Sequence, residues 1–188
     1  MITHDQALKF LNEQIENKNI VKHMLATEAI MRTLAKHLES EKEDKYATAG
    51  LLHDGDYRED VPHQKQGVKV TETLRKKGFD VPDDVAHTMA AHNRENTGVK
   101  PETKMDWSLF ICDSLTGLIV ATALVRPDKK LSSVTVKSVL KKFKTPSFAA
   151  GTRREDIKLC QEKLGLSLDE FIALSLKAMQ KIAPDLGL

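Results

Sequence analysis

Apolar residues recur at spacings of three and four along most of the chain, which is the pattern of helices with one buried face. No segment shows the sustained alternation of apolar and polar residues that is typical of a half-buried strand. The pattern therefore predicts an all-α protein. A capping box at Thr3 indicates the start of the first helix. The other helices are predicted over residues 19–40, 45–54, 63–77, 80–92, 104–125, 134–142, 153–164 and 168–182.

The predicted helix at residues 104–125 is apolar around nearly its whole circumference, which is typical of a central helix. Asp113 lies in its middle. An ionised carboxylate is costly to bury unless a cation or several hydrogen-bond donors compensate it. Asp113 is therefore a candidate metal ligand, and the alternative is a buried partner for an arginine.

The predicted helix at residues 45–54 ends in the string Ala-Gly-Leu-Leu-His-Asp, just before Gly55. Polar residues at the end of so apolar a run should be hydrogen-bonded, paired or bound to a metal. The carboxyl end of a helix also favours a cation. We expect His53 and Asp54 to hold a metal ion, with a helix-end cap and a polar contact as the alternative.

Other residues of the same types occupy inward faces or ends of predicted helices. The six candidate metal ligands come from five segments: His23, His53, Asp54, His63, His92 and Asp113. Mixed imidazole and carboxylate ligands suit a divalent ion such as manganese, iron, nickel or magnesium. Six ligands exceed the need of one tetrahedral ion, which hints at two ions that share Asp54.

This arrangement resembles the HD superfamily of metal-dependent phosphohydrolases. The matching residues are a histidine, His23, a His-Asp pair about 30 residues later, His53-Asp54, and a distant aspartate, Asp113. The resemblance covers roughly residues 20–124. Dinuclear members add two histidines between the pair and the last aspartate, and His63 and His92 match them. Residues 94–98 replace the glycine-tyrosine-proline signature of the cyclic-dinucleotide branch, which argues against hydrolysis of cyclic di-GMP.

The resemblance implies an HD-type helical bundle with extra C-terminal helices. We expect a single domain over residues 1–188, with a metal-binding core at about 20–125 and a helical extension at about 126–188. The implied activity is hydrolysis of a nucleotide or other small phosphate ester by metal-activated water. Asp54, Lys65 and Arg94 are the candidate catalytic residues, with Arg58 and Arg126 as further candidates for binding phosphate.

Composition adds little that is specific. The formal charge is +2, no run of about 18 apolar residues predicts a membrane helix, and no signal peptide is recognised. The two cysteines have no metal or redox spacing, which fits a reduced, cytoplasmic setting. From the small charge and the missing apolar run we expect no interaction with a membrane, and binding of nucleic acid is unlikely. The basic residues of segment 129–154 leave open a non-catalytic module that binds a nucleotide or nucleic acid. A di-iron oxygenase-type relative is a third possibility, and the oligomeric state is left open.

Overall fold

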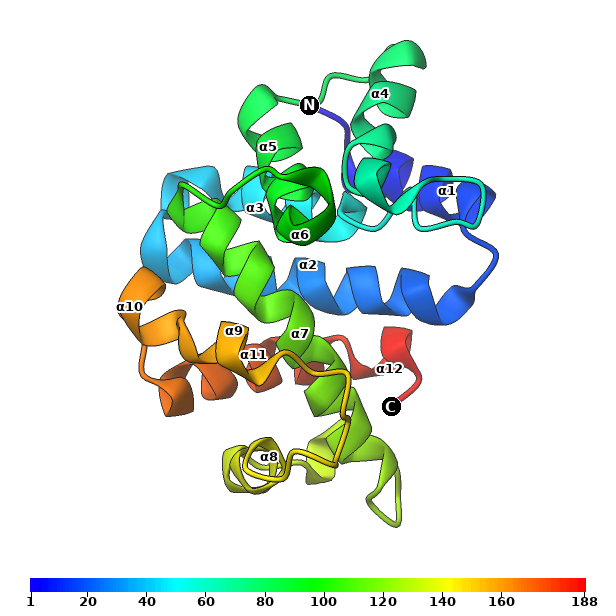
Figure 1. The fold of residues 1–188 in the computed structure, drawn as a ribbon. Helices are drawn as coiled ribbons and strands as arrows, with labels where there is room; N and C mark the ends of the chain where they lie inside the picture. Colours follow the sequence, from blue (N-terminus) through cyan, green and yellow to red (C-terminus); the bar gives the residue numbers. More distant parts are fainter.

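The structure is a computed structural model that describes residues 1–188, and it contains helices and loops but no strand (Figure 1). The all-α prediction is therefore confirmed. The α-helices are α1 (His4–Gln14), α2 (Lys18–Leu38), α3 (Glu43–Leu52), α4 (Lys69–Lys76), α5 (Asp83–His92), α6 (Arg94–Thr97), α7 (Lys104–Leu124), α8 (Val136–Phe143), α9 (Arg154–Lys158), α10 (Cys160–Leu164), α11 (Leu168–Lys181) and α12 (Ala183–Leu186). Three short 3₁₀ helices are η1 (Ser40–Lys42), η2 (His63–Lys65) and η3 (Leu131–Ser133).

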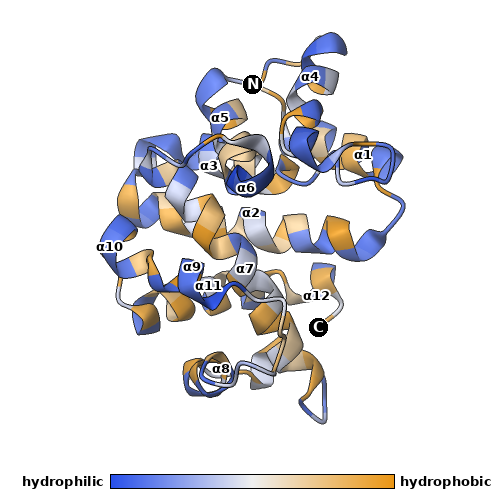
Figure 2. Ribbon diagram, viewed as in Figure 1, coloured by the Kyte–Doolittle hydropathy of each residue, from blue (hydrophilic) through white to orange (hydrophobic).

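Helices α2 and α7 are the two longest and carry the centre of the fold. Helix α2 packs against α3 on one side and α11 on the other, while α7 crosses α2 and also contacts α5 (Figure 1). Buried hydrophobic residues from Ile2 to Leu186 form one continuous core. Figure 2 shows hydrophobic residues on most of the helices, whereas the short helix α6 is hydrophilic. Helix α7 is long and apolar enough to cross a membrane, but most of it is buried here, and core helices share that composition.

The close approach of α3 to α2 depends on Gly50. A Cβ atom at this position would lie 3.0 Å from both the Cα and the backbone nitrogen of Glu28, and 3.0 Å from Cγ of Met31. Only a residue without a side chain allows the two helices to lie this close. The contact places His53, which directly follows α3, opposite His23 on α2.

The predicted helix at residues 63–77 begins later than expected. His63 lies in the 3₁₀ turn η2, and α4 starts only at Lys69. Gly67 has a φ of +86°, which a right-handed helix cannot contain. The buried carboxylate of Asp56 accepts hydrogen bonds from the backbone N–H groups of Gly67 and Val70 and so caps α4 from the preceding loop.

Candidate metal centre

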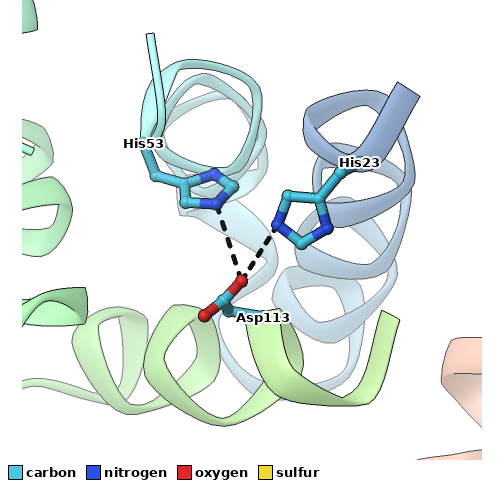
Figure 3. A group of neighbouring side chains, drawn as sticks. All are labelled: His23, His53 and Asp113. Carbon is cyan, nitrogen blue, oxygen red and sulfur yellow. Dashed lines mark ion pairs between the residues drawn. The ribbon is translucent and has the colours of Figure 1, made fainter. Parts of the chain in front are cut away.

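Helix α2, the turn after α3 and helix α7 bring His23, His53 and Asp113 together (Figure 3). The Nε2 atom of His23 lies 2.9 Å from Oδ1 of Asp113, and Nε2 of His53 lies 3.8 Å from the same oxygen. Asp54 adds a second carboxylate: its Oδ2 lies 3.4 Å from His53 Nε2 and 3.9 Å from His23 Nε2. Asp54 therefore lies beside this first cluster, through its separations from the two histidines.

His92 joins this group through the other oxygen of Asp54. Its Nε2 atom lies 3.4 Å from Asp54 Oδ1, and His53, Asp54 and His92 form a second cluster of three. The two oxygens of Asp54 thus face different histidines. This arrangement supports the expectation that Asp54 can be shared between two metal positions.

The three histidines have their rings fixed by hydrogen bonds at Nδ1. His53 Nδ1 donates to the carbonyl of Gly50 at 2.9 Å, and His92 Nδ1 donates to a main-chain carbonyl of α5 one turn earlier. His23 Nδ1 lies 2.9 Å from the hydroxyl of Thr116, which itself donates to a main-chain carbonyl of α7 and therefore accepts from the ring. Because a carbonyl can only accept, Nδ1 carries the proton and Nε2 is the atom available for a metal.

The donor set fits a divalent cation. His53 Nε2 is fully buried and has no hydrogen-bond partner, although it faces two carboxylates. Such an orphaned buried atom is costly unless something else binds it. The separations of 2.9 Å and 3.8 Å from Asp113 to the two histidines of the first cluster, and of 3.4 Å from Asp54 to each histidine of the second, also suit a bound ion. Adjacent ligands at ~2.1 Å from a metal are separated by about 3 Å.

Electrostatics within the cluster keep both carboxylates ionised. Burial by itself would raise the pKa values of Asp54 and Asp113, but the neighbouring histidines outweigh it and hold both well below the usual range. Burial likewise disfavours a charged His53, yet Asp54 and Asp113 raise its pKa to about 10. Two half-buried negative charges therefore demand positive charge between them, which protons or a metal ion can supply.

The sixth predicted ligand, His63, is not brought into either cluster. Its side chain is exposed and its Nδ1 lies 3.1 Å from Oε1 of Gln66. The turn that contains His63 is nevertheless close to the site, because the side-chain amide of Asn93 donates to the His63 carbonyl at 3.1 Å. Lys65, in the same turn, is also exposed.

The predicted phosphate-binding arginines divide into two groups. Arg58 pairs with Asp60 at 3.0 Å, and Arg126 donates to the carbonyl of Ser133, so both stabilise local loops. Arg94 lies nearer the site. Its guanidinium is 4.4 Å from the centre of the Phe110 ring, which belongs to α7 one turn before Asp113.

Sequence reasoning missed one residue at the site, Arg153. Its Nη2 atom lies 3.2 Å from Oδ2 of Asp113, its Nε lies 2.8 Å from Asp156, and its guanidinium is 5.5 Å from the centre of the Phe110 ring. In the sequence, Arg153 is one of many basic residues, and it is 40 residues away from its partner. The alternative that the sequence offered for Asp113, an arginine partner, was the available signal, and Arg153 is such a partner.

A cavity of about 390 Å³ opens beside the donor cluster. It is lined by residues from α2, α7 and the loop before α9, namely His23, Asp113, Ser114, Gly117 and residues 149–153. A small ligand in this cavity would contact two of the candidate metal ligands and Arg153 at once.

A helical bundle whose inward histidines and aspartates converge on one point defines a metal-binding helical protein. The HD domain family matches residues 20–118, slightly more than half of the chain, and the chain therefore belongs to the HD superfamily of metal-dependent phosphohydrolases. The matched region contains His23, the His53-Asp54 pair and Asp113. Comparisons with curated proteins and with solved structures found no match.

Proposed function

We propose that this protein hydrolyses small phosphate monoesters, including nucleotides, with the help of one or two divalent cations. The observation that carries the proposal is the convergence of three histidine Nε2 atoms, each with its Nδ1 already bonded, on the carboxylates of Asp54 and Asp113. His23, His53, Asp54 and Asp113 would hold a first ion. His92 and the second oxygen of Asp54 would contribute to a second position.

A divalent cation bound there would supply Lewis acidity, since it lowers the pKa of water and offsets charge on a phosphoryl group. The protein's own residues orient the reaction. Asp54 stays ionised at neutral pH and can accept a hydrogen bond from the attacking water. Asp54 lies between His53 and His92, so that such a water would lie beside both candidate metal positions.

Arg153 is the residue best placed to bind phosphoryl oxygens. It lines the cavity with His23 and Asp113, and its side chain is 39% exposed, so that part of its guanidinium can reach a ligand. Arg94 lies against the same Phe110 ring. A guanidinium presents paired N–H donors that match two phosphate oxygens. Lys65 remains a candidate from the sequence alone.

The test is hydrolysis of a panel of phosphate monoesters by protein loaded with manganese, ferrous iron, nickel or magnesium. We expect metal-dependent release of phosphate that falls at least about 100-fold in Asp54→Asn and His53→Ala, because both changes remove metal ligands. His37→Ala, which changes an exposed histidine of α2, is the matched control. Full activity in Asp54→Asn would contradict the proposal.

The two alternative functions predict other measurements. Binding of nucleic acid through segment 129–154 is disfavoured because Arg154 donates to main-chain carbonyls, Lys142 lies 4.2 Å from the Phe148 ring centre, and Arg153 pairs with Asp113. These cations stabilise the loop itself. A di-iron oxygenase would consume oxygen with ferrous iron and remain inactive with manganese.

A further inference from the structure

We propose that Arg153 competes with the metal ion for Asp113 and thereby sets how tightly the centre holds that ion. This inference rests on the metal centre of the proposed function and concerns the regulation of that site. Arg153 lies outside the HD region, which ends at residue 118. The metal ligands and their competitor therefore come from different parts of the chain.

The two oxygens of Asp113 face different partners. Its Oδ1 atom lies 2.9 Å from Nε2 of His23 and 3.8 Å from Nε2 of His53, and Figure 3 shows that both rings face this one oxygen. Its Oδ2 atom accepts a hydrogen bond from Nη2 of Arg153 at 3.2 Å. A histidine can ligate a metal through a lone pair, whereas a guanidinium offers only N–H donors. Arg153 can therefore neutralise Asp113 but cannot share in binding an ion.

The position of Arg153 is fixed by contacts other than the one with Asp113. Its Nε atom lies 2.8 Å from Oδ2 of Asp156, whose side chain is only 14% exposed, and its guanidinium is 5.5 Å from the centre of the Phe110 ring. Arg154, the next residue, holds the loop through hydrogen bonds to main-chain carbonyls. Because these contacts order Arg153 in advance, the ion pair with Asp113 costs little additional conformational entropy.

The charge of Arg153 opposes the binding of a cation in two ways. It offsets the negative charge by which Asp113 would attract the ion, and it repels the ion directly. Charges a few ångströms apart near a protein surface can change an affinity by on the order of tenfold or more. The side chain of Arg153 is 39% exposed, so solvent screens part of this effect, and Asp156 offsets another part. We therefore expect Arg153 to lower the affinity about tenfold.

The opposite role would be support, in which Arg153 holds Asp113 in the orientation that the ion requires. Removal of a supporting residue weakens binding of the ion, whereas removal of a competitor strengthens it. The competing role is favoured because other features already place Asp113. It lies in the middle of α7, a long and mostly buried helix, and its Oδ1 atom directly faces His23.

The experiment measures manganese binding by calorimetry to the full chain and its variants, each first treated with a chelator and desalted. Arg153→Met removes the charge and the donors but keeps a long side chain beside Phe110. Arg153→Gln is a second neutral variant that keeps a polar end, and Arg153→Lys retains the charge. Lys158→Met removes one positive charge from an exposed residue of α9 that pairs with Glu155, and serves as the control.

We expect the dissociation constant for manganese to fall about tenfold in both neutral variants, and to change less than about threefold in Arg153→Lys and Lys158→Met. An unchanged or weaker affinity in the neutral variants would overturn the inference. An equal gain in Arg153→Lys would also overturn it, because charge could then not be the cause, and so would the absence of manganese binding in every protein. If the neutral variants bind manganese more tightly but the unchanged protein hydrolyses no ester, the proposed function fails and the competition at Asp113 stands.

Discussion

Replacing Asp106 with asparagine tests the contact that joins the helix carrying Asp113 to the helix carrying His92. Asp106 lies in the first turn of α7 and is almost fully buried. Its Oδ2 accepts hydrogen bonds from the backbone N–H groups of Glu102 at 3.0 Å and Thr103 at 2.9 Å. Its Oδ1 accepts from the hydroxyl of Thr88 on α5. One carboxylate thus caps α7 and ties it to α5.

The cost of the substitution follows from these three bonds. In Asp106→Asn the amide oxygen can still accept from the two backbone N–H groups, while its NH₂ group faces the Thr88 hydroxyl, which can rotate to accept. The bonds survive but lose the charge that makes them about twice as strong as neutral ones. A loss of about 1 kcal/mol per bond, less the saving from not burying a charge, gives a net destabilisation of about 1–3 kcal/mol. For a chain of this length, Tm should fall by about 3–10 °C.

The pH dependence gives the sharper assay. Burial alone would raise the pKa of Asp106, but the Thr88 hydroxyl and the backbone N–H groups outweigh it and lower that pKa. A carboxylate with a lowered folded pKa stabilises the protein above its unfolded pKa of about 3.9, and this stability is lost as the pH falls through the folded value. The stability gap between the two proteins should therefore be full at pH 7 and shrink below about pH 4.

Urea unfolding of both proteins at a series of pH values measures this gap. Thr88→Val removes only the hydroxyl donor and should reproduce part of the loss at pH 7. Equal stability of Asp106→Asn and the unchanged protein at pH 7 would refute the reasoning. So would a gap that stays constant down to pH 3, since its cause could not then be the charge.

Three further outcomes are expected. Gly67→Ala places a side chain on a backbone with a φ of +86° and against the α5 backbone and His92. The free energy of unfolding in urea should fall by about 2 kcal/mol or more, and an unchanged value would contradict this geometry. Gly50→Ala places a methyl group against the Glu28 backbone and should lower the free energy of unfolding by about 1–3 kcal/mol. It should also weaken manganese binding measured by calorimetry, and an unchanged affinity would show that the spacing of α2 and α3 does not determine the geometry of the site. Manganese at 100 times its Kd should stabilise the protein by about 2.7 kcal/mol in thermal unfolding, and an equal gain in His53→Ala would place the ion elsewhere.

The sequence predicts the fold well where the pattern is local. The capping box at Thr3 occurs as expected, because it needs only two residues that are three positions apart. The start of α4 was predicted too early because the group that caps it, Asp56, lies in a different loop. The pattern of apolar and polar residues along the chain does not reveal a hydrogen bond that forms between separate segments only in the folded protein.

The same distinction holds for the candidate site. His23, His53, Asp54, His92 and Asp113 share inward positions on helices, and the structure brings all five together. His63 was expected on a helix that starts at residue 63, but α4 begins only at Lys69, and the His63 side chain lies at the surface. The lysine and arginines proposed to bind phosphate were chosen only by their charge and by their nearness in sequence to the predicted ligands or helix ends. These two criteria cannot distinguish an arginine that stabilises a loop through hydrogen bonds from one that faces the site.

The contribution of the C-terminal extension to the site follows from two adjacent arginines. Arg154 donates hydrogen bonds to main-chain carbonyls of Phe143, Thr145 and Phe148, and so folds the loop before α9 back on itself. The preceding residue, Arg153, is thereby held against Asp113, and part of its guanidinium faces the cavity. The matched HD region ends at residue 118 and contains all five clustered candidate metal ligands, but none of residues 149–153. Since residues 149–153 line the same cavity as His23 and Asp113, the choice of ligand should depend on the extension as well as on the HD region.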